Sequence, residues 1–134
     1  MKIDLDYLKQ LLDTFENSEK AFTNIIEFKK NGMDYNSEEF IFHLYLLWDN
    51  KLISTEFPED SNFGLSRLGN GEPSWTVKNL RLTYDGHQFI EALRNEDIWN
   101  KLNKDFKKSG MSTIVDVSKT LLGEYLKQKL GLTK

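Results

Sequence analysis

Residues 37–53 read SEEFIFHLYLLWDNKLI, and they contain the strongest helix signal of the chain. Either Asn36 together with Glu39, or Ser37 alone, can cap a helix here, and every position of Phe40–Trp48 except His43 is apolar or aromatic. A helix that is apolar on almost all sides is normally buried over most of its surface. We therefore expect a helix over 37–49 at the centre of the core or of an interface, with a strand over Leu52–Phe57 after it.

The residues before this helix predict one further helix and one strand. Residues 4–16 repeat large apolar side chains at spacings of three and four, which predicts an amphipathic helix capped by Asp4. The repeated residues are Leu5, Leu8, Leu12 and Phe15. Residues 21–29 mix β-branched and aromatic side chains without such a stripe, so we expect a short strand near 23–28.

A β hairpin is expected after the strand. Asn70-Gly71 predicts a two-residue turn, because both residues tolerate positive φ. Strands should flank this turn at about 64–68 and 75–81. We also expect exposed aromatic side chains in this region, which are Phe57, Phe63 and Trp75.

Three helices are predicted in the rest of the chain. The first is capped by Thr83 and runs to about Arg94, and Asn95 caps the second, over 96–108. The break Lys107–Gly110 is a candidate hinge, and the last helix covers about 112–130.

This order of elements is that of a winged helix with one helix missing or shortened. HLYLLWDNKLI, residues 43–53, resembles the end of a winged-helix recognition helix that runs into the first strand of the wing. LTYDGHQFI, residues 82–90, resembles the last wing strand and the closing helix. Winged helices often have glycine where Lys51 stands, so we expect Asn50 to take the left-handed conformation that ends the helix.

A more specific resemblance extends the second phrase. Residues 82–101, together with the start at 1–8 and the tail at 126–132, resemble the family catalogued as domain of unknown function twenty-five thirteen. The resemblance implies a source in a bacterium or its phage, and it implies no activity. The expected fold class is α+β, with a winged-helix-like core over 1–95, a small antiparallel β wing, and a C-terminal helical extension over 96–134 packed on that core as a single domain.

Composition and motifs favour a protein without catalytic chemistry. The 134 residues include no Cys, which excludes disulfides, cysteine zinc sites and cysteine nucleophiles. The sequence contains no P-loop, no complete GxGxxG, no HExxH and no GxSxG. The two histidines, His43 and His87, are each expected to have a structural role. We therefore expect no enzyme activity, no cofactor, no metal and no small-molecule substrate.

Charge is distributed unevenly along the chain. The formal net charge is −3, but residues 1–99 carry 10 Lys/Arg against 18 Asp/Glu, while residues 100–134 carry 8 Lys against 3 Asp/Glu. A DNA-binding domain is usually basic, because neutralising phosphates supplies much of its affinity. The helix over 37–49 is acidic and apolar, which makes it a poor reader of a polyanion. The candidate nucleic-acid contacts are Arg67, Lys78, Arg81, Lys101, Lys104, Lys107 and Lys108.

The last helix has three interpretations that the sequence leaves open. It can close the core, it can self-associate, or it can lie on a membrane surface, although its few cations make the last a poor fit. The candidate self-association residues are Ile114, Val117, Leu121, Leu122, Tyr125 and Leu126.

Together these observations predict a non-catalytic interaction module that acts through protein–protein contacts or self-association. Its expected partner is another protein or a second copy of the chain, without a membrane, and its expected location is the cytoplasm. The alternative is a winged-helix DNA-binding regulator that uses the wing and the Lys-rich stretch 101–108.

Overall fold

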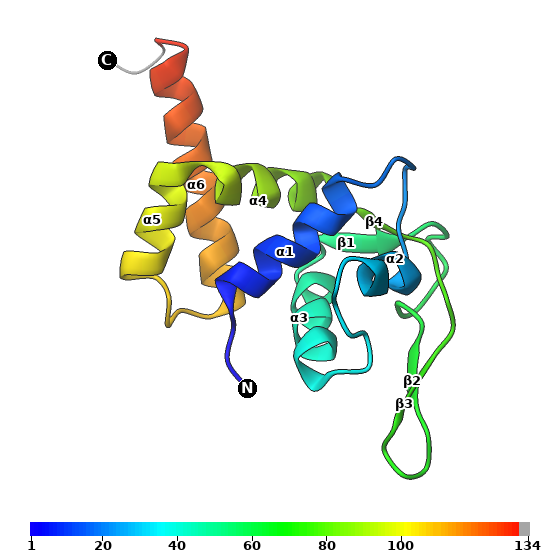
Figure 1. The fold of residues 1–134 in the computed structure, drawn as a ribbon. Coiled ribbons are helices and arrows are strands. Elements are labelled where there is room, and N and C mark those ends of the chain that lie inside the picture. The colour runs from blue at the N-terminus through cyan, green and yellow to red at the C-terminus, as the bar shows by residue number, and fades with distance from the viewer. Residues whose placement is uncertain (132–134) are drawn as a thin grey trace.

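The computed structural model describes residues 1–131, and Figure 1 shows their arrangement. Helices dominate the described chain, and short strands separate α3 from α4. The elements are α1 (Leu5–Glu16), α2 (Ile25–Lys30), α3 (Glu38–Asp49), β1 (Ile53–Thr55), β2 (Leu65–Arg67), β3 (Pro73–Trp75), β4 (Leu80–Leu82), α4 (Tyr84–Arg94), α5 (Glu96–Asp105) and α6 (Met111–Lys129). The α+β class, with antiparallel strand pairs and additional C-terminal helices, is confirmed.

The strands form two small antiparallel pairs. β1 pairs with β4, with Ile53 opposite Leu82, and β2 pairs with β3, with Leu65 opposite Trp75. Thr23 adds an isolated bridge to Leu80 through two backbone hydrogen bonds of 2.8 and 2.7 Å. β4 therefore lies between Thr23 and β1, and the β2–β3 hairpin extends away from the helices (Figure 1).

The strand expected near 23–28 is wrong apart from Thr23, because Ile25–Lys30 is the helix α2. The Asn24 side chain caps this helix by accepting hydrogen bonds from the backbone N–H groups of Ile26 and Glu27. Ile25 and Phe28, three residues apart, are the buried side chains of α2. Packing of this single apolar pair outweighs the strand preference of the β-branched residues. The predicted order, in which one helix was missing or shortened, therefore has the short helix α2 at this place.

The hairpin turn also differs from the expectation. Gly71 has a φ of +85°, and Asn70 is not among the residues with positive φ. The N–H of Gly71 donates to the carbonyl of Leu68 at 2.9 Å, so the loop is a three-residue turn that ends in one left-handed glycine. The single strand expected at 75–81 is two strands with different partners, β3 and β4.

The end of α3 places the left-handed residue one position later than expected. Lys51 has a φ of 58°, whereas Asn50 has a φ of −92°. The N–H of Leu52 donates to the carbonyl of Leu47 at 2.9 Å, and the N–H of Lys51 donates to the carbonyl of Trp48 at 3.0 Å. These two hydrogen bonds form a Schellman motif, which requires the residue after the C-cap to be left-handed.

One core joins all the helices. Buried residues of α1, α3 and α4 form its centre, and α6 packs against α4 and α5. A series of edge-on aromatic contacts crosses the N-terminal half, from Phe15 to Phe28 at 5.2 Å and from Phe28 to Phe40 at 5.4 Å. Trp75 of the hairpin contacts Phe40 and Phe63, so the hairpin base belongs to the core. Phe63 is buried rather than exposed as expected, because it packs under α3.

Candidate interaction surfaces

One side of α3 faces away from the core, and we call it the α3 face. It consists of Glu39, Phe42, Tyr45, Leu46 and Asp49, whose spacings of three and four place them on one side of the helix. The other side of α3 is buried. Tyr45 is 44% exposed, and Phe42 and Leu46 are half-buried between the two exposed carboxylates. The α3 face therefore has an aromatic and apolar centre with an acidic residue at each end.

The hairpin is attached to the start of α3 by a bidentate ion pair. The Arg67 guanidinium donates to both carboxylate oxygens of Glu38, at 3.0 and 3.1 Å, and to the carbonyl of Gly71 at 3.0 Å. Hydrogen bonding to Arg67 lowers the pKa of Glu38, and the same contact raises the pKa of Arg67. The charge of the hairpin arginine is thus already matched by a carboxylate of the chain itself.

The part of the chain that carries the α3 face is acidic, whereas Lys2 and Lys107 of other segments line the hollow beside Glu39. Residues 38–80, which run from α3 to the start of β4, carry 7 Asp/Glu and 3 Lys/Arg. Among these cations, Lys78 approaches Asp60 at 3.7 Å and also donates to the carbonyl of Asn62 at 3.3 Å. This region therefore has a negative net charge, which repels phosphates and attracts cations.

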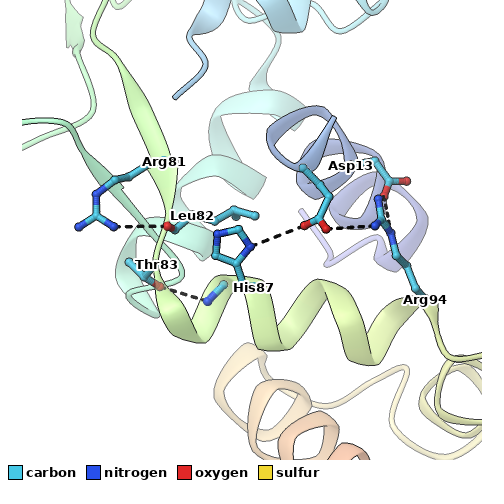
Figure 2. A network of polar contacts seen from close by, with 8 residues as sticks. Asp13, Arg81, Leu82, Thr83, His87 and Arg94 are labelled. Atoms are coloured by element: carbon cyan, nitrogen blue, oxygen red, sulfur yellow. Dashed lines mark hydrogen bonds and ion pairs between the residues drawn. The ribbon is translucent and has the colours of Figure 1, made fainter. Parts of the chain in front are cut away.

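The structure does not gather the seven candidate nucleic-acid contacts on one face. Arg81 is exposed and donates a hydrogen bond to the carbonyl of the next residue, Leu82, at 3.4 Å (Figure 2). Lys101 approaches Asp105 at 3.5 Å. The three remaining candidates, which lie in α5 and in the loop after it, are exposed, and within residues 1–131 no ion pair is found for them. They are Lys104, Lys107 and Lys108. Figure 1 places α5 on the opposite side of the molecule from the β2–β3 hairpin.

The six candidate self-association residues divide between core and surface. Ile114 and Leu122 are buried, and Val117 and Leu121 are half-buried against the body. The other two, Tyr125 and Leu126, are each 37% exposed on the last turns of α6, which project beyond α4 in Figure 1. Most of the predicted stripe therefore closes the core.

His43 has a structural role, as expected. Its Nε2 accepts a hydrogen bond from the backbone N–H of Asp4 at 2.9 Å, so its Nδ1 carries the proton that points at the carbonyl of Glu39, 2.7 Å away. The ring is buried and ties the start of α1 to α3. Although a hollow of about 470 Å³ adjoins this histidine, neither ring nitrogen is left to bind a metal or move a proton.

His87 belongs to a charged network between α1 and α4 (Figure 2). Its Nδ1 lies 3.7 Å from Glu16, which also approaches Arg94 at 3.3 Å, and Arg94 donates to Asp13 at 2.8 Å. His43 contacts the N-terminal end of α1, and His87 contacts its C-terminal end. These two ends are about 18 Å apart in a helix of this length. The two histidines therefore do not form a dyad. Among the described residues there is no cluster of His, Cys, Asp and Glu that could hold a metal ion.

Sequence reasoning did not identify the α3 face, because it predicted α3 as buried on nearly all sides. The usable signal was the pair Glu39 and Asp49, which share one side of the helix and therefore mark the side turned to solvent.

None of the helices described over residues 1–131 is both long and apolar enough to cross a membrane.

Comparison with known proteins adds a family without adding an activity. A family model described as "Hypothetical protein (DUF2513)" matches residues 2–112, which include α3 and the hairpin and leave out most of α6. A protein of Haemophilus influenzae described as "Uncharacterized protein" is 24% identical over 131 residues, covering 98% of this chain and 100% of its own length. No solved structure matches.

Proposed function

The chain belongs to the DUF2513 family, and on that premise we propose that it is a non-catalytic interaction module of bacterial or phage origin. It acts in the cytoplasm through contacts with other proteins. The observation that supports this proposal is the chemistry of the α3 face, whose exposed side chains are aromatic and acidic. Exposed aromatic residues on a rigid helix are typical of protein interfaces.

The position of α3 in the fold strengthens this inference. The order of the elements from α1 through the Thr23 bridge to β4 resembles that of a winged helix. In helix-turn-helix proteins the second helix enters the DNA major groove and presents polar or basic side chains to base edges. In this resemblance α3 corresponds to the second helix, and it offers Glu39, Phe42, Tyr45 and Asp49 instead. The element that a regulator would use for DNA is thus better suited to a protein surface.

The alternative, a DNA-binding regulator, has its cations in unsuitable places. Arg67 is engaged by Glu38, and Lys78 is within reach of Asp60. The Lys-rich stretch 101–108 lies on the far side of the molecule from the hairpin (Figure 1). The cations available for phosphate contacts are therefore divided between two separate parts of the molecule and are not gathered around the hairpin.

The proposal is tested by two measurements on the full chain. A photoreactive amino acid at position 45 should form a discrete adduct with a protein in host cells, while the same group at Thr120, on an exposed side of α6, should not. A labelled random duplex of about 30 base pairs, titrated at about 50 and 200 mM salt, should show no binding. Duplex binding that weakens steeply with salt, or an adduct at position 45 that nuclease removes, would overturn the proposal in favour of the DNA-binding alternative.

A further inference from the structure

We infer that the α3 face binds a cationic amphipathic segment of a partner protein, an inference that rests on the proposed function. The segment presents apolar side chains between two lysines or arginines. Its chemistry follows from the arrangement of the α3 face, from the net charge of residues 38–80 that carry it, and from the rigidity of the central tyrosine.

The arrangement sets the spacing of the partner's groups. Glu39 and Asp49 are ten residues apart, which is about 15 Å along a helix. Phe42, Tyr45 and Leu46 lie between them. Within the described residues neither carboxylate takes part in an ion pair, in contrast to Glu38. Two cations about 15 Å apart, with apolar groups between them, would complement this pattern.

Tyr45 supplies the preorganised centre. Its ring packs edge-on against the buried ring of Phe63 at 4.9 Å, and Trp48 contacts the same ring at 5.6 Å. The tyrosine is therefore held in place on one side while 44% of its surface remains exposed. A large side chain that is already fixed loses little conformational entropy on binding, which is why such residues dominate interface energies.

Charge selects the sign of the partner. The region from α3 to the start of β4 has a net negative charge, so an acidic peptide or a nucleic acid would meet repulsion there. The exposed apolar area of the α3 face is small, since two of its three apolar residues are half-buried. The contact therefore belongs to the weak and transient class of interfaces, in which charge steers the encounter.

The test uses a synthetic helical peptide as the probe and the full chain as the receptor. The peptide is rich in alanine and carries lysines at positions 1 and 11 and leucines at positions 4, 7 and 8, which mirrors the α3 face. Its twin has glutamates in place of the lysines. Fluorescence anisotropy should show saturable binding of the lysine peptide below about 1 mM, at least about tenfold tighter than binding of the twin.

Variants connect the binding to the α3 face. Tyr45→Ala should weaken binding about tenfold or more. The double variant Glu39→Gln and Asp49→Asn should weaken it several-fold and remove most of its salt dependence. Both carboxylates are exposed, so this variant keeps the fold even where Tyr45→Ala perturbs Phe63. Tyr84→Ala and Glu91→Gln, exposed residues of α4, serve as matched controls and should leave binding unchanged.

Equal binding of both peptides, binding of neither, or equal loss in the α4 controls would overturn the inference. A second comparison separates this failure from failure of the proposed function. If the lysine peptide does not bind while the photoreactive group at position 45 still captures a protein, the chemistry assigned to the partner is wrong and the interaction module stands. If both measurements are negative, both proposals fall.

Discussion

Replacing Gly86 by alanine tests how α4 joins the rest of the molecule. Gly86 lies in the first turn of α4, where the helix backbone passes close to the backbone of Leu52, the residue before β1. A Cβ atom added at this glycine would overlap the carbonyl oxygen of Leu52 and lie 3.2 Å from Cδ2 of Leu82. The overlap involves backbone, which cannot rotate out of the way, so α4 would have to move.

Movement of α4 would strain the hydrogen bonds that hold its first turn. The N–H of Thr83 donates to the carbonyl of Leu52 at 3.0 Å, and its hydroxyl donates to the carbonyl of Lys51 at 2.7 Å. Overpacking costs about 1–3 kcal/mol, and each lost hydrogen bond costs about 1 kcal/mol. The higher helix propensity of alanine offsets about 1 kcal/mol of this loss in the free energy of unfolding. Gly86→Ala should therefore lower the free energy of unfolding by about 3 kcal/mol and Tm by about 10 °C.

The matched control is the same substitution at Gly123 in α6, where an added Cβ meets nothing within 4 Å. Gly123→Ala should raise the free energy of unfolding by about 1 kcal/mol, since only helix propensity changes. Urea and thermal unfolding followed by tryptophan fluorescence and circular dichroism would measure both variants. If the two substitutions shift stability in the same direction, the close approach of α4 to Leu52 is wrong.

Three further predictions concern single contacts. Lys51→Gly should stabilise the protein by about 1 kcal/mol in urea unfolding, because the left-handed φ of 58° is strained for lysine; a loss of stability would contradict this. His43→Phe should cost about 2 kcal/mol by leaving the N–H of Asp4 without an acceptor, and an unchanged urea midpoint would show that this hydrogen bond is not formed. Arg67→Ala should return the lowered pKa of Glu38 towards its ordinary value of 4.5, measured by carboxyl ¹³C NMR. Since the pKa is lowered in the fold, the stabilisation from this pair is present above pH 4.5 and is lost as the pH falls below it; the same Glu38 titration in both proteins would refute the assignment.

Helix starts were predictable from sequence because capping is local chemistry. Asp4, Thr83 and Asn95 were each predicted as caps, and Ser37 was one of two caps predicted for α3. In all four cases the side chain accepts a hydrogen bond from the backbone N–H three residues later. Such a bond depends on a few consecutive residues only. The positions of α1, α3, α4 and α5 followed from these caps and from the apolar stripes behind them.

α2 and the end of α3 were not predictable in the same way, because distant contacts decide them. Ile25 and Ile26 have a preference for strands, and α2 forms because Phe28 packs between Phe15 and Phe40. Lys51 is left-handed because β1 must leave α3 at a fixed angle to reach β4, which outweighs the local preference for Asn50. Neither constraint is visible in a short window of sequence.

The candidate site shows a similar division. By hydrophobicity alone, Phe42 and Tyr45 on the surface cannot be told from Phe40 and Leu44 in the core. Only the positions of the acidic residues Glu39 and Asp49 along the helical repeat show which side of α3 faces solvent. The contact of Arg67 with Glu38, which spans 29 residues, depends on where the hairpin lies and therefore could not be predicted.

The ion pair between Arg67 and Glu38 connects the fold to the proposed function. By holding the hairpin against α3, it also neutralises the cation that a wing would otherwise offer to a phosphate. A phosphate contact would require Arg67 to exchange one bidentate oxyanion for another, which gains little. It would also leave the Glu38 carboxylate unpaired beside the nucleic acid, and like charges repel. The same interaction that positions the hairpin thus disfavours DNA on the α3 face, and it leaves Glu39 and Asp49 to select a cationic protein partner.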